Sequence, residues 1–550
     1  MMSGGGVIMG NHQPNRFTRR TLLQYGGRTI GALAGLALLD ACGGSKTTGG
    51  SQPSPSAIPS PTSAPSPTAP STPATARVTA TVANASSGKI DLSQWSPDYV
   101  KQIAGTLTTV DTKAAVSKVV PLETSGQLLY WYIGPTDTTP QVEKDYDKQF
   151  WDSWKQTYPN IKTETQTLTY DSMLDKIRTA AAGNAAPMVA TMPILWGVEF
   201  AAKGQLAEIS LEEFGFTEND FWPGALKSCR WKGKLYGIPT NNETMALIWN
   251  KKLFEQAGLN PEQPPKTWEE LVSFAKQIKD KTGKYGYGLV ARQNHGNTPF
   301  RFMPVLWAYG SGAFDEAEPN PTYEKVLINN DGGMAALEVY YNMYVRDQSA
   351  PPSALTNTNA ENTDLFFAGQ LGMYIGHPSE YAVMVDRAQK ATGSDKQRAL
   401  DLLNNIGYAL IPEGPVRRAV VFGGSNIHIF NDKFVRGGKV DRTAARAFIA
   451  FRCSPEWATK LVWASSNPGN LQGFLTPWMK QRLDQTKFLE VTTAMLKYGV
   501  PFPVVPESTQ IMNIIIPEMI HNALTKKMSI KDAVNDAASK IQNLMKQRPS

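Results

Sequence analysis

Residues 127–159 read QLLYWYIGPTDTTPQVEKDYDKQFWDSWKQTYP and begin the stretch that decides the fold. The opening run, 127–132, is apolar and aromatic and lies between Gly126 and Gly134-Pro135, which predicts a buried strand. In the segment that follows, an apolar side chain recurs at every fourth position, which predicts an amphipathic helix ending at Pro159. These positions are Val142, Tyr146, Phe150 and Trp154. We expect Trp151 and Trp154 both to pack in the core.

The same alternation of strands and helices continues along the chain. Residues 161–167 and 188–192 have the pattern of strands, and 171–182 has the pattern of a helix between them. The order strand, helix, strand, helix, strand predicts an α/β layer with a mostly parallel sheet. Further on, a capping box predicts a helix from residue 267, and a last helix is predicted over 529–544.

The composition argues against several classes of protein. The chain has 550 residues, of which 41% are hydrophobic and 19% charged, so it can form a globular body larger than one ordinary domain. The formal net charge is +7, but no basic run follows Arg20, so we do not expect nucleic-acid binding. The five histidines lack metal-binding spacing, and the sequence has no nucleophile elbow or phosphate loop. We therefore expect no catalysis, no metal and no cofactor.

The cysteine count is low. Cys42, Cys229 and Cys453 are too few for a disulfide scaffold, and no C-x-x-C pair points to zinc. Cys229 and Cys453 form either one disulfide bond or two separate buried thiols.

The N-terminus has the features of an export signal. Arg19-Arg20 precede an uncharged, apolar stretch at 29–39, which is too short to cross a bilayer about 30 Å thick. The paired arginines resemble the twin-arginine signal, although the general export route stays open. Residues 39–44 read LDACGG and resemble the bacterial lipoprotein box, which would place a diacylglycerol on Cys42. We expect 1–41 to be a signal peptide and the protein to be anchored at the outer face of the cell membrane.

A spacer follows the predicted lipid anchor. Residues 47–76 carry no charge, and 53–73 contain eight prolines among Ser, Thr and Ala. Such a composition cannot bury a core, so we expect 42–90 to be a disordered tether. Residues 91–126 are expected to form a partly ordered lead-in to the globular body.

Several motifs occur in a specific order. The strongest is LYGIP at 235–239, followed by LIWNKKLF at 247–254; FFAGQLGM at 366–373 and FGGS at 422–425 come later. With the opening strand, the helix–glycine segment at 175–187 and the helical C-terminal tail, this series resembles family 1 of the extracellular solute-binding proteins. That family includes the maltose-binding protein of ABC transporters. The resemblance covers 127–546.

The resemblance implies an α/β, two-lobed periplasmic-binding-protein-like (type II) fold with a hinge and an interlobe cleft. Lobe 1 is expected to comprise 127–240 and 424–470, and lobe 2 to comprise 241–423 and 471–546. The family binds a small molecule in the cleft by hinge closure and delivers it to the permease of an ABC importer. We expect the protein to act as a monomer.

The resemblance also implies a set of ligand-binding residues around the cleft. Asn513 stands near an aromatic position of the maltose-binding member, which argues against a maltodextrin ligand. The predicted set is Trp131, Thr136, Asp137, Met192, Leu195, Trp196, Asn241, Asn242, Glu243, Phe300, Arg301, Trp307, His377, Glu380, Tyr381, Gly424, Ser425 and Asn513.

These residue types suit a neutral sugar. A pyranose packs its C–H face on an aromatic ring, and its hydroxyls need paired donors and acceptors, which Asn241, Glu243 and Arg301 can supply. Polyol phosphates, polyamines and metal chelates remain alternatives, as does a protein that presents its ligand to a sensor. The sugar itself, the affinity and the partner permease are not determined by the sequence.

Overall fold

A computed structural model describes residues 90–137 and 139–548. The chain divides into two units, 1–79 and 80–550, and every described residue belongs to the second. The predicted signal peptide, the lipidation site at Cys42 and almost all of the predicted tether therefore lie outside the described residues.

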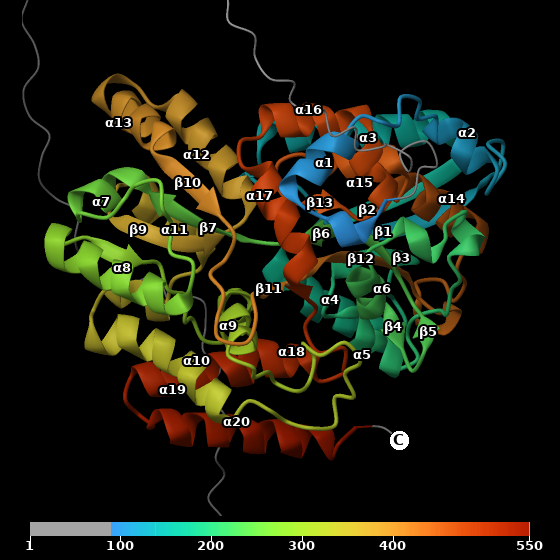
Figure 1. Cartoon of the computed structure of the whole chain (residues 1–550). Helices are drawn as coiled ribbons and strands as arrows, with labels where there is room; N and C mark the ends of the chain where they lie inside the picture. Colours follow the sequence, from blue (N-terminus) through green and yellow to red (C-terminus); the bar gives the residue numbers. More distant parts are fainter. Residues whose placement is uncertain (1–89, 138, 549–550) are drawn as a thin grey trace, which may run out of the picture. The chain divides into compact units, whose positions relative to one another are not determined.

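The first sheet consists of β1 (Gly126–Ile133), β2 (Ile161–Leu168), β3 (Val189–Pro193), β6 (Ile238–Glu243), β12 (Gly423–Ile429) and β13 (Asn467–Pro468). The strand order is β13-β6-β12-β3-β1-β2 (Figure 1). β1 pairs parallel with β2 and β3, whereas β12 is antiparallel to β3 and β6. The three strands predicted between residues 127 and 192 are confirmed. We call this sheet and the helices packed around it the first lobe.

The helices of the first lobe are amphipathic. Their bounds are α3 (Gln141–Thr157), α4 (Tyr170–Ala182), α5 (Gly197–Ala202), α6 (Pro223–Ser228), α14 (Arg442–Arg452) and α15 (Pro455–Lys460). α3 buries Phe150 and Trp154 as its four-residue spacing predicts, and it ends shortly before Pro159. A short hairpin, β4 (Arg230–Trp231) and β5 (Lys234–Leu235), leads into β6.

The second sheet consists of β7 (Ala246–Asn250), β8 (Tyr285–Tyr287), β9 (Leu371–Gly376) and β10 (Ile406–Ala409). Its order is β10-β7-β9-β8. Together with its helices it forms the second lobe. These helices are α7 (Lys251–Gln256), α8 (Trp268–Thr282), α9 (Asn297–Ala308), α10 (Asp331–Tyr341), α11 (Asn359–Phe367), α12 (Pro378–Lys390), α13 (Gly393–Asn404), α18 (Ser508–Gln510), α19 (Ile516–Leu524) and α20 (Ile530–Met545).

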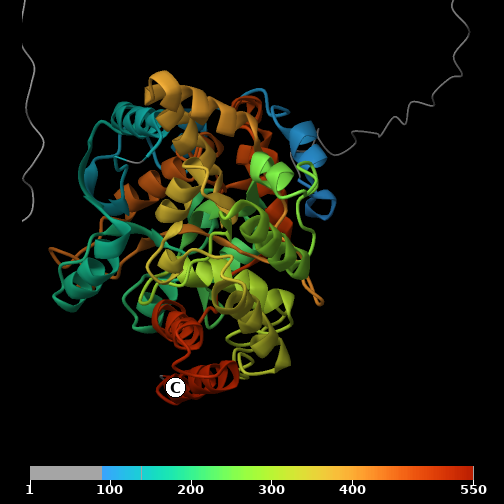
Figure 2. The ribbon, with the colours of Figure 1, turned by 90° about the vertical axis from the view of Figure 1, so that its left-hand side faces the viewer.

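Local sequence signals explain the helix boundaries of the second lobe. The capping box predicted for α8 forms in part: the hydroxyl of Thr267 accepts a hydrogen bond from the backbone N–H of Glu270 at 3.2 Å, but the carboxylate of Glu270 accepts the N–H of Lys266 at 2.7 Å. α19 and α20 at the C-terminus pack against α10, as both views of the ribbon show (Figures 1 and 2). The two sheets, each covered by helices, confirm the predicted α/β class.

The chain passes between the lobes at short extended segments. β6 leads directly into β7, and β11 (Val420–Val421), which pairs with β14 (Gly499–Val500), leads into β12. The hydroxyl of Thr244, between β6 and β7, donates a hydrogen bond of 2.5 Å to the carbonyl of Thr492, which lies in the helix over 489–494. These crossings form the hinge region.

The predicted boundary after residue 470 is wrong for part of the chain. The 3₁₀-helix η9 (Leu471–Leu475) and α16 (Pro477–Gln485) pack against α15 of the first lobe rather than in the second. α17 (Leu489–Ala494) lies between the lobes, because Leu489 joins a first-lobe cluster while Phe488 stacks on Tyr408 of the second lobe at 4.4 Å. Apolar side chains in this segment find partners on the nearer lobe, which sequence order does not indicate.

The lead-in is more ordered than expected. It forms the 3₁₀-helix η3 (Leu92–Gln94), α1 (Pro97–Ile103) and α2 (Thr112–Ser117). Trp95 is buried edge-on against Trp222 and Phe474, and its indole N–H donates to the carbonyl of Thr493 at 2.9 Å. The lead-in is therefore part of the first lobe.

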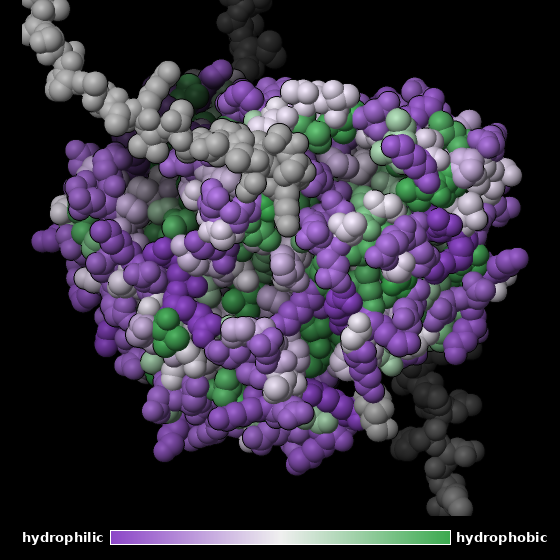
Figure 3. Space-filling model, turned by 45° about the vertical axis from the view of Figure 1, so that its right-hand side comes forward, coloured by the Kyte–Doolittle hydropathy of each residue, from purple (hydrophilic) through white to green (hydrophobic). Residues whose placement is uncertain are grey.

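Two further features concern the interior and the surface. Cys229 and Cys453 are both free and buried, so the alternative of two separate thiols is correct. The face shown in Figure 3 is mainly hydrophilic, and the well-exposed large hydrophobic side chains of the described residues are Leu400, Val416 and Ile514. In residues 90–137 and 139–548, no helix combines the length and the apolar character needed to cross a membrane.

Candidate ligand-binding site

Three predicted site residues from different segments meet at the hinge. Glu243 ends β6, Phe300 lies in α9, and His377 precedes α12. The Oε1 atom of Glu243 is 3.8 Å from Nδ1 of His377, and the rings of Phe300 and His377 are 6.5 Å apart. A Cβ atom at Gly423 would lie 2.9 Å from the ring of Phe300 and 3.3 Å from Oε2 of Glu243. The glycine therefore allows this close approach.

The buried position changes the ionisation of these residues. Loss of solvation raises the pKa of Glu243 to about 7, although the positive charge of Arg301 acts in the opposite direction. The side chain of Glu243 is 30% exposed, because it borders a cavity. Burial, assisted by Arg301, lowers the pKa of His377 to about 3. Near neutral pH the histidine is neutral, so the contact between Glu243 and His377 is not an ion pair.

A cavity of about 290 Å³ extends from Glu243 into the first lobe, and we call it the first-lobe cavity. Asn241, Glu243 and Ser425 of the predicted set line it at the hinge end. Deeper in the lobe it is lined by residues that the sequence analysis missed, among them Tyr132, Asp147, Trp151 and Arg452. The cavity thus combines aromatic rings with hydroxyl, amide and charged groups.

The loop over 461–466 forms one wall of the first-lobe cavity and is held by two buried side chains, Glu143 and Arg482. Glu143 of α3 accepts hydrogen bonds from the backbone N–H groups of Ala464 and Ser465, both at 2.8 Å. The guanidinium of Arg482 in α16 donates to backbone carbonyls on the other side. These bonds reach Trp463 at 2.8 Å, Val462 at 2.7 Å and Ser466 at 2.6 Å. The wall is therefore rigidly positioned before any ligand binds.

A second cavity, of about 520 Å³, lies between the lobes. The predicted residues Trp196 and Asn513 line it from opposite lobes, and Tyr170 packs on Trp196 with ring centres 5.3 Å apart. A Cβ atom at Gly296 would lie 2.7 Å from the hydroxyl of Tyr170, so a glycine is needed where the lobes approach. This interlobe cavity is the larger part of the cleft.

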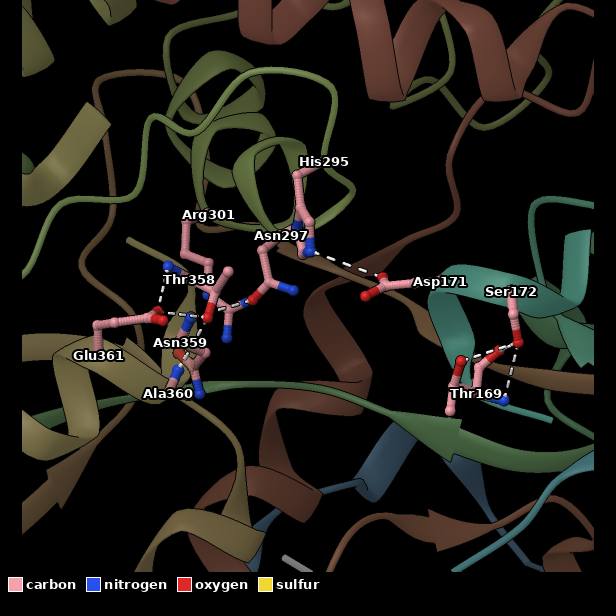
Figure 4. Close-up of polar contacts among 10 residues, drawn as sticks. All are labelled: Thr169, Asp171, Ser172, His295, Asn297, Arg301, Thr358, Asn359, Ala360 and Glu361. Carbon is pink, nitrogen blue, oxygen red and sulfur yellow. Dashed lines mark hydrogen bonds and ion pairs between the residues drawn. The ribbon is translucent and has the colours of Figure 1, made fainter. Parts of the chain in front are cut away.

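The sequence analysis also missed a polar contact at the interlobe cavity. Nε2 of His295 points toward Asp171 across the cleft at 4.0 Å (Figure 4). Nδ1 of His295 accepts the backbone N–H of Asn297 at 3.1 Å, so Nε2 carries the proton in the neutral ring. Burial lowers the pKa of His295, which leaves this contact weak near neutral pH.

Arg301 lies behind the cleft rather than in its lining. Its side chain is 2% exposed, and Nη1 donates to Oδ1 of Asn297 at 3.1 Å (Figure 4). Its Nε and Nη2 atoms are buried without a hydrogen-bond partner among the described residues. Neither of the two cavities includes Arg301 in its lining.

Several other predicted residues have structural positions that differ from the prediction. Trp307 is fully buried in the second lobe and donates to Glu316 at 2.9 Å, and Asn242 donates to the carbonyl of Pro468 at 2.8 Å. Glu380 accepts the N–H of His377 at 2.9 Å, and burial raises its pKa to about 8. Each of these three side chains forms a hydrogen bond within the protein. The predicted residues that line neither cavity are Trp131, Thr136, Asp137, Met192, Leu195, Asn242, Phe300, Arg301, Trp307, His377, Glu380, Tyr381 and Gly424.

Two of these residues have a clear structural explanation. Gly424 has a φ of 126°, and a Cβ atom there would lie 2.2 Å from the carbonyl oxygen of Asn241, so only glycine fits. Tyr381 packs edge-on against Phe488, with ring centres 5.5 Å apart. Gly424 shapes the strand beside the cavity, and Tyr381 packs against the segment that joins the lobes.

Trp151 packs against the core, as expected, but it also borders a cavity. It is half-buried, lines the first-lobe cavity and donates to the hydroxyl of Tyr132 at 3.2 Å. The strand pattern of 127–132 places Tyr130 and Tyr132 on one face of the sheet and could have indicated that they act together. Nothing in the local sequence indicates a cavity beside them. Among residues 90–137 and 139–548, no three His, Cys, Asp or Glu side chains are grouped as metal ligands would be.

Comparisons with known proteins agree with this architecture. A family model described as bacterial extracellular solute-binding protein matches residues 132–459. A putative binding protein of Brucella abortus (strain 2308) is 25% identical over 402 residues, which are 70% of this chain and 87% of that protein. A mannitol-binding protein of Pseudomonas aeruginosa is 25% identical over 371 residues, which are 64% of this chain and 78% of that protein.

A solved structure supports the fold. Maltose-bound MalE3 of T. maritima has a TM-score of 0.62 and 22% identity, and the likeness covers 76% of this chain and 100% of that one. The two-lobed fold expected from the sequence is thereby confirmed. Since the family model matches more than half of the residues, the chain belongs to the bacterial extracellular solute-binding proteins, which bind solutes for transport and are not enzymes.

Proposed function

We propose that this protein is the substrate-binding component of an ABC importer and that it binds a carbohydrate between its two lobes. Closure of the lobes around the sugar would present the closed form to the membrane permease. The observation that carries the proposal is the lining of the first-lobe cavity. Aromatic rings of Tyr132 and Trp151 occur there together with Asn241, Ser425 and several other hydroxyl side chains.

This lining suits a neutral, polyhydroxylated ligand. Aromatic faces pack on C–H groups, and short hydroxyl and amide side chains pair with sugar hydroxyls. A phosphorylated polyol would find a single cationic side chain, Arg452, in the described lining of this cavity. A polyamine would gain little from Glu243, because the raised pKa of this carboxyl leaves it only partly ionised near neutral pH.

Two of the similar proteins point in the same direction. The similar protein of Pseudomonas aeruginosa is described as mannitol-binding, and the similar structure from T. maritima contains maltose. Both ligands are neutral and rich in hydroxyl groups. Presentation of the ligand to a sensor would use the same closed form and is the alternative to transport.

Export and anchoring complete the proposal. The paired arginines and the LDACGG segment favour a protein that is exported and attached through a lipid on Cys42 at the outer face of the cell membrane. The protein would act there as a monomer. Partitioning of the full chain into a detergent phase, and its loss in Cys42→Ser, tests the anchor.

Thermal unfolding tests the ligand class. Residues 42–550 with Cys42→Ser are heated with monosaccharides, disaccharides, oligosaccharides and hexitols, and with spermidine, glycerol phosphate and ferric citrate as controls. A ligand at a hundred times its dissociation constant adds about 2.7 kcal/mol to the free energy of unfolding, which is a clear shift in midpoint. We expect at least one sugar or hexitol to stabilise the protein. A response to a control compound alone would contradict the carbohydrate proposal.

A further inference from the structure

The first-lobe cavity contains two charged side chains of opposite sign that do not pair with each other. Asp147 lies on α3, and Arg452 is the last residue of α14. Among the described residues, neither side chain forms a hydrogen bond, nor an ion pair within 4.0 Å, and Nη1 of Arg452 is buried without a partner. On the same helix, Asp152 forms an ordinary surface pair with Lys148 at 2.8 Å.

Both charges face the same aromatic group. The hydroxyl of Tyr132 accepts the indole N–H of Trp151 at 3.2 Å, and the Tyr132 ring stacks on Tyr130 at 5.0 Å. Burial raises the pKa of Tyr132 to about 12; Asp147 acts in the same direction and Arg452 in the opposite one. Asp147, Arg452 and Tyr132 therefore line one cavity, and both charges act on the Tyr132 hydroxyl.

An unpaired charge away from bulk water lowers stability unless a ligand or water compensates it. Burial raises the pKa of Asp147, which is the expected effect of such a position. The cavity volume of about 290 Å³ is close to the lower end of small-molecule sites, roughly 300 Å³. The cavity is thus large enough for one small organic unit that interacts with both groups.

We propose that the first-lobe cavity is a subsite for one sugar unit, whose adjacent hydroxyl groups bind between Asp147 and Arg452. The carboxylate accepts hydroxyl protons, and the guanidinium donates to hydroxyl oxygens. The indole of Trp151 provides an apolar face for the C–H groups. The inference rests on the proposed function and adds to it the residues that select the sugar.

The rest of the lining favours a sugar over a small zwitterion. Six Ser and Thr side chains line the cavity, and these are Thr139, Thr191, Thr240, Ser425, Ser465 and Ser466. A zwitterionic amino acid would use the two charges, whereas a sugar unit also packs its C–H face on the ring of Trp151. A sugar unit can pair with both kinds of group.

The position of the subsite has a consequence for the order of binding. All of its lining residues belong to the first lobe or to the end of β6, and none comes from the second lobe. The subsite therefore exists before the lobes close. One sugar unit binds to the open protein first, and closure then covers the part of the ligand that extends toward Glu243.

Binding measurements on matched variants test the subsite. Asp147→Asn and Arg452→Met each remove one charge, and Asp152→Asn on the exposed face of the same helix is the control. Each variant is made in residues 42–550 with Cys42→Ser, and calorimetry measures its affinity for D-glucose, D-mannitol, D-tagatose, maltose and maltotriose. L-alanine is measured as the zwitterionic ligand. We expect Asp147→Asn and Arg452→Met to weaken binding of the preferred sugar about 10- to 100-fold, and the control to stay within about twofold.

Each result distinguishes this inference from the proposed function. Binding that is unchanged in Asp147→Asn and Arg452→Met would overturn the subsite but leave the proposed function intact. Binding of L-alanine that is lost in these variants would overturn the sugar assignment. A wild-type protein that binds none of the five carbohydrates would overturn both proposals. Circular dichroism checks that both variants fold. Because Asp147→Asn keeps the shape of the side chain, it tests the subsite even if Arg452→Met does not fold.

Discussion

Each lobe contains a buried arginine near a buried glutamate, and the two arginines differ in how their N–H groups are used. Arg482 in the first lobe is 0% exposed and donates to three backbone carbonyls of the loop 461–466. Arg301 in the second lobe is 2% exposed and donates to Asn297 alone. Their burial is nearly equal, but their hydrogen bonding is not.

The difference shows that burial does not by itself make a charged residue important for stability. Burial lowers the pKa of Arg482 to about 10, yet it remains charged near neutral pH, and Glu143 holds the other side of the same loop. Arg301 has Glu243 and Glu380 nearby, but burial raises the pKa of both carboxyls, so neither provides a full negative charge. The first arrangement fixes a cavity wall, whereas the second leaves a cation with little compensation.

Removing Arg482 is expected to give the largest effect. Arg482→Met leaves three buried carbonyls and the carboxyl of Glu143 without their cation, so the free energy of unfolding falls by about 3–5 kcal/mol. Denaturant unfolding measures this loss. Arg436→Met, at an exposed residue that pairs with Glu164, serves as the control and changes stability by less than about 0.5 kcal/mol. A similar small change in Arg482→Met would contradict the assigned role in the wall.

The pH dependence of stability tests the protonation of Glu243 beside Arg301, and its expected effect is smaller than that of Arg482→Met. The pKa of Glu243 rises from 4.5 to about 7 in the folded protein. Between these values the folded state keeps a proton that the unfolded state has released, so the free energy of unfolding falls as the pH rises. Glu243→Gln removes this loss. The variant therefore gains about 1–2 kcal/mol relative to wild type as the pH rises through this window, since solvent still reaches part of the side chain.

Unfolding curves near pH 5 and pH 7 measure this difference. The control is Glu164→Gln, because the hydrogen bond from Arg436 lowers the pKa of Glu164 and gives the opposite sign. His377 contributes in the other direction within the wild type, since its pKa is lowered to about 3 and the neutral ring favours folding as the pH rises. Equal pH profiles for Glu243→Gln and wild type would show that Glu243 is ionised normally.

Removing Arg301 is expected to give the smallest effect on stability. Arg301→Met loses one hydrogen bond, and the nearby carboxyls can remain protonated near neutral pH, so the free energy of unfolding changes by less than about 1 kcal/mol. The same denaturant series as for Arg482→Met makes the comparison direct. A loss as large as that of Arg482→Met would mean that the two arginines stabilise the protein equally and that the contrast in hydrogen bonding is irrelevant.

The sequence predicted the regular elements well where a local period determines them. The apolar run predicted as a strand lies in β1, and the four-residue spacing of α3 buries Phe150 and Trp154 as expected. The same period could not separate Trp151 from these core positions, because a cavity and the core lie on adjoining faces of one helix. Of the predicted ligand-binding residues, Asn241, Glu243 and Ser425 line one cavity, and Trp196 and Asn513 line the other.

The sequence by itself determined the α/β order of strands and helices, the cap at Thr267 and the family motifs that lead to the hinge. These features depend on residues that are neighbours along the chain, where spacing and capping act directly. Only the tertiary structure decided that Asp147 and Arg452 share a cavity, that η9 and α16 join the first lobe, and that Arg301 lies behind the cleft. Such contacts depend on how distant segments pack and on the direction of each side chain, and a single sequence contains no local signal for either.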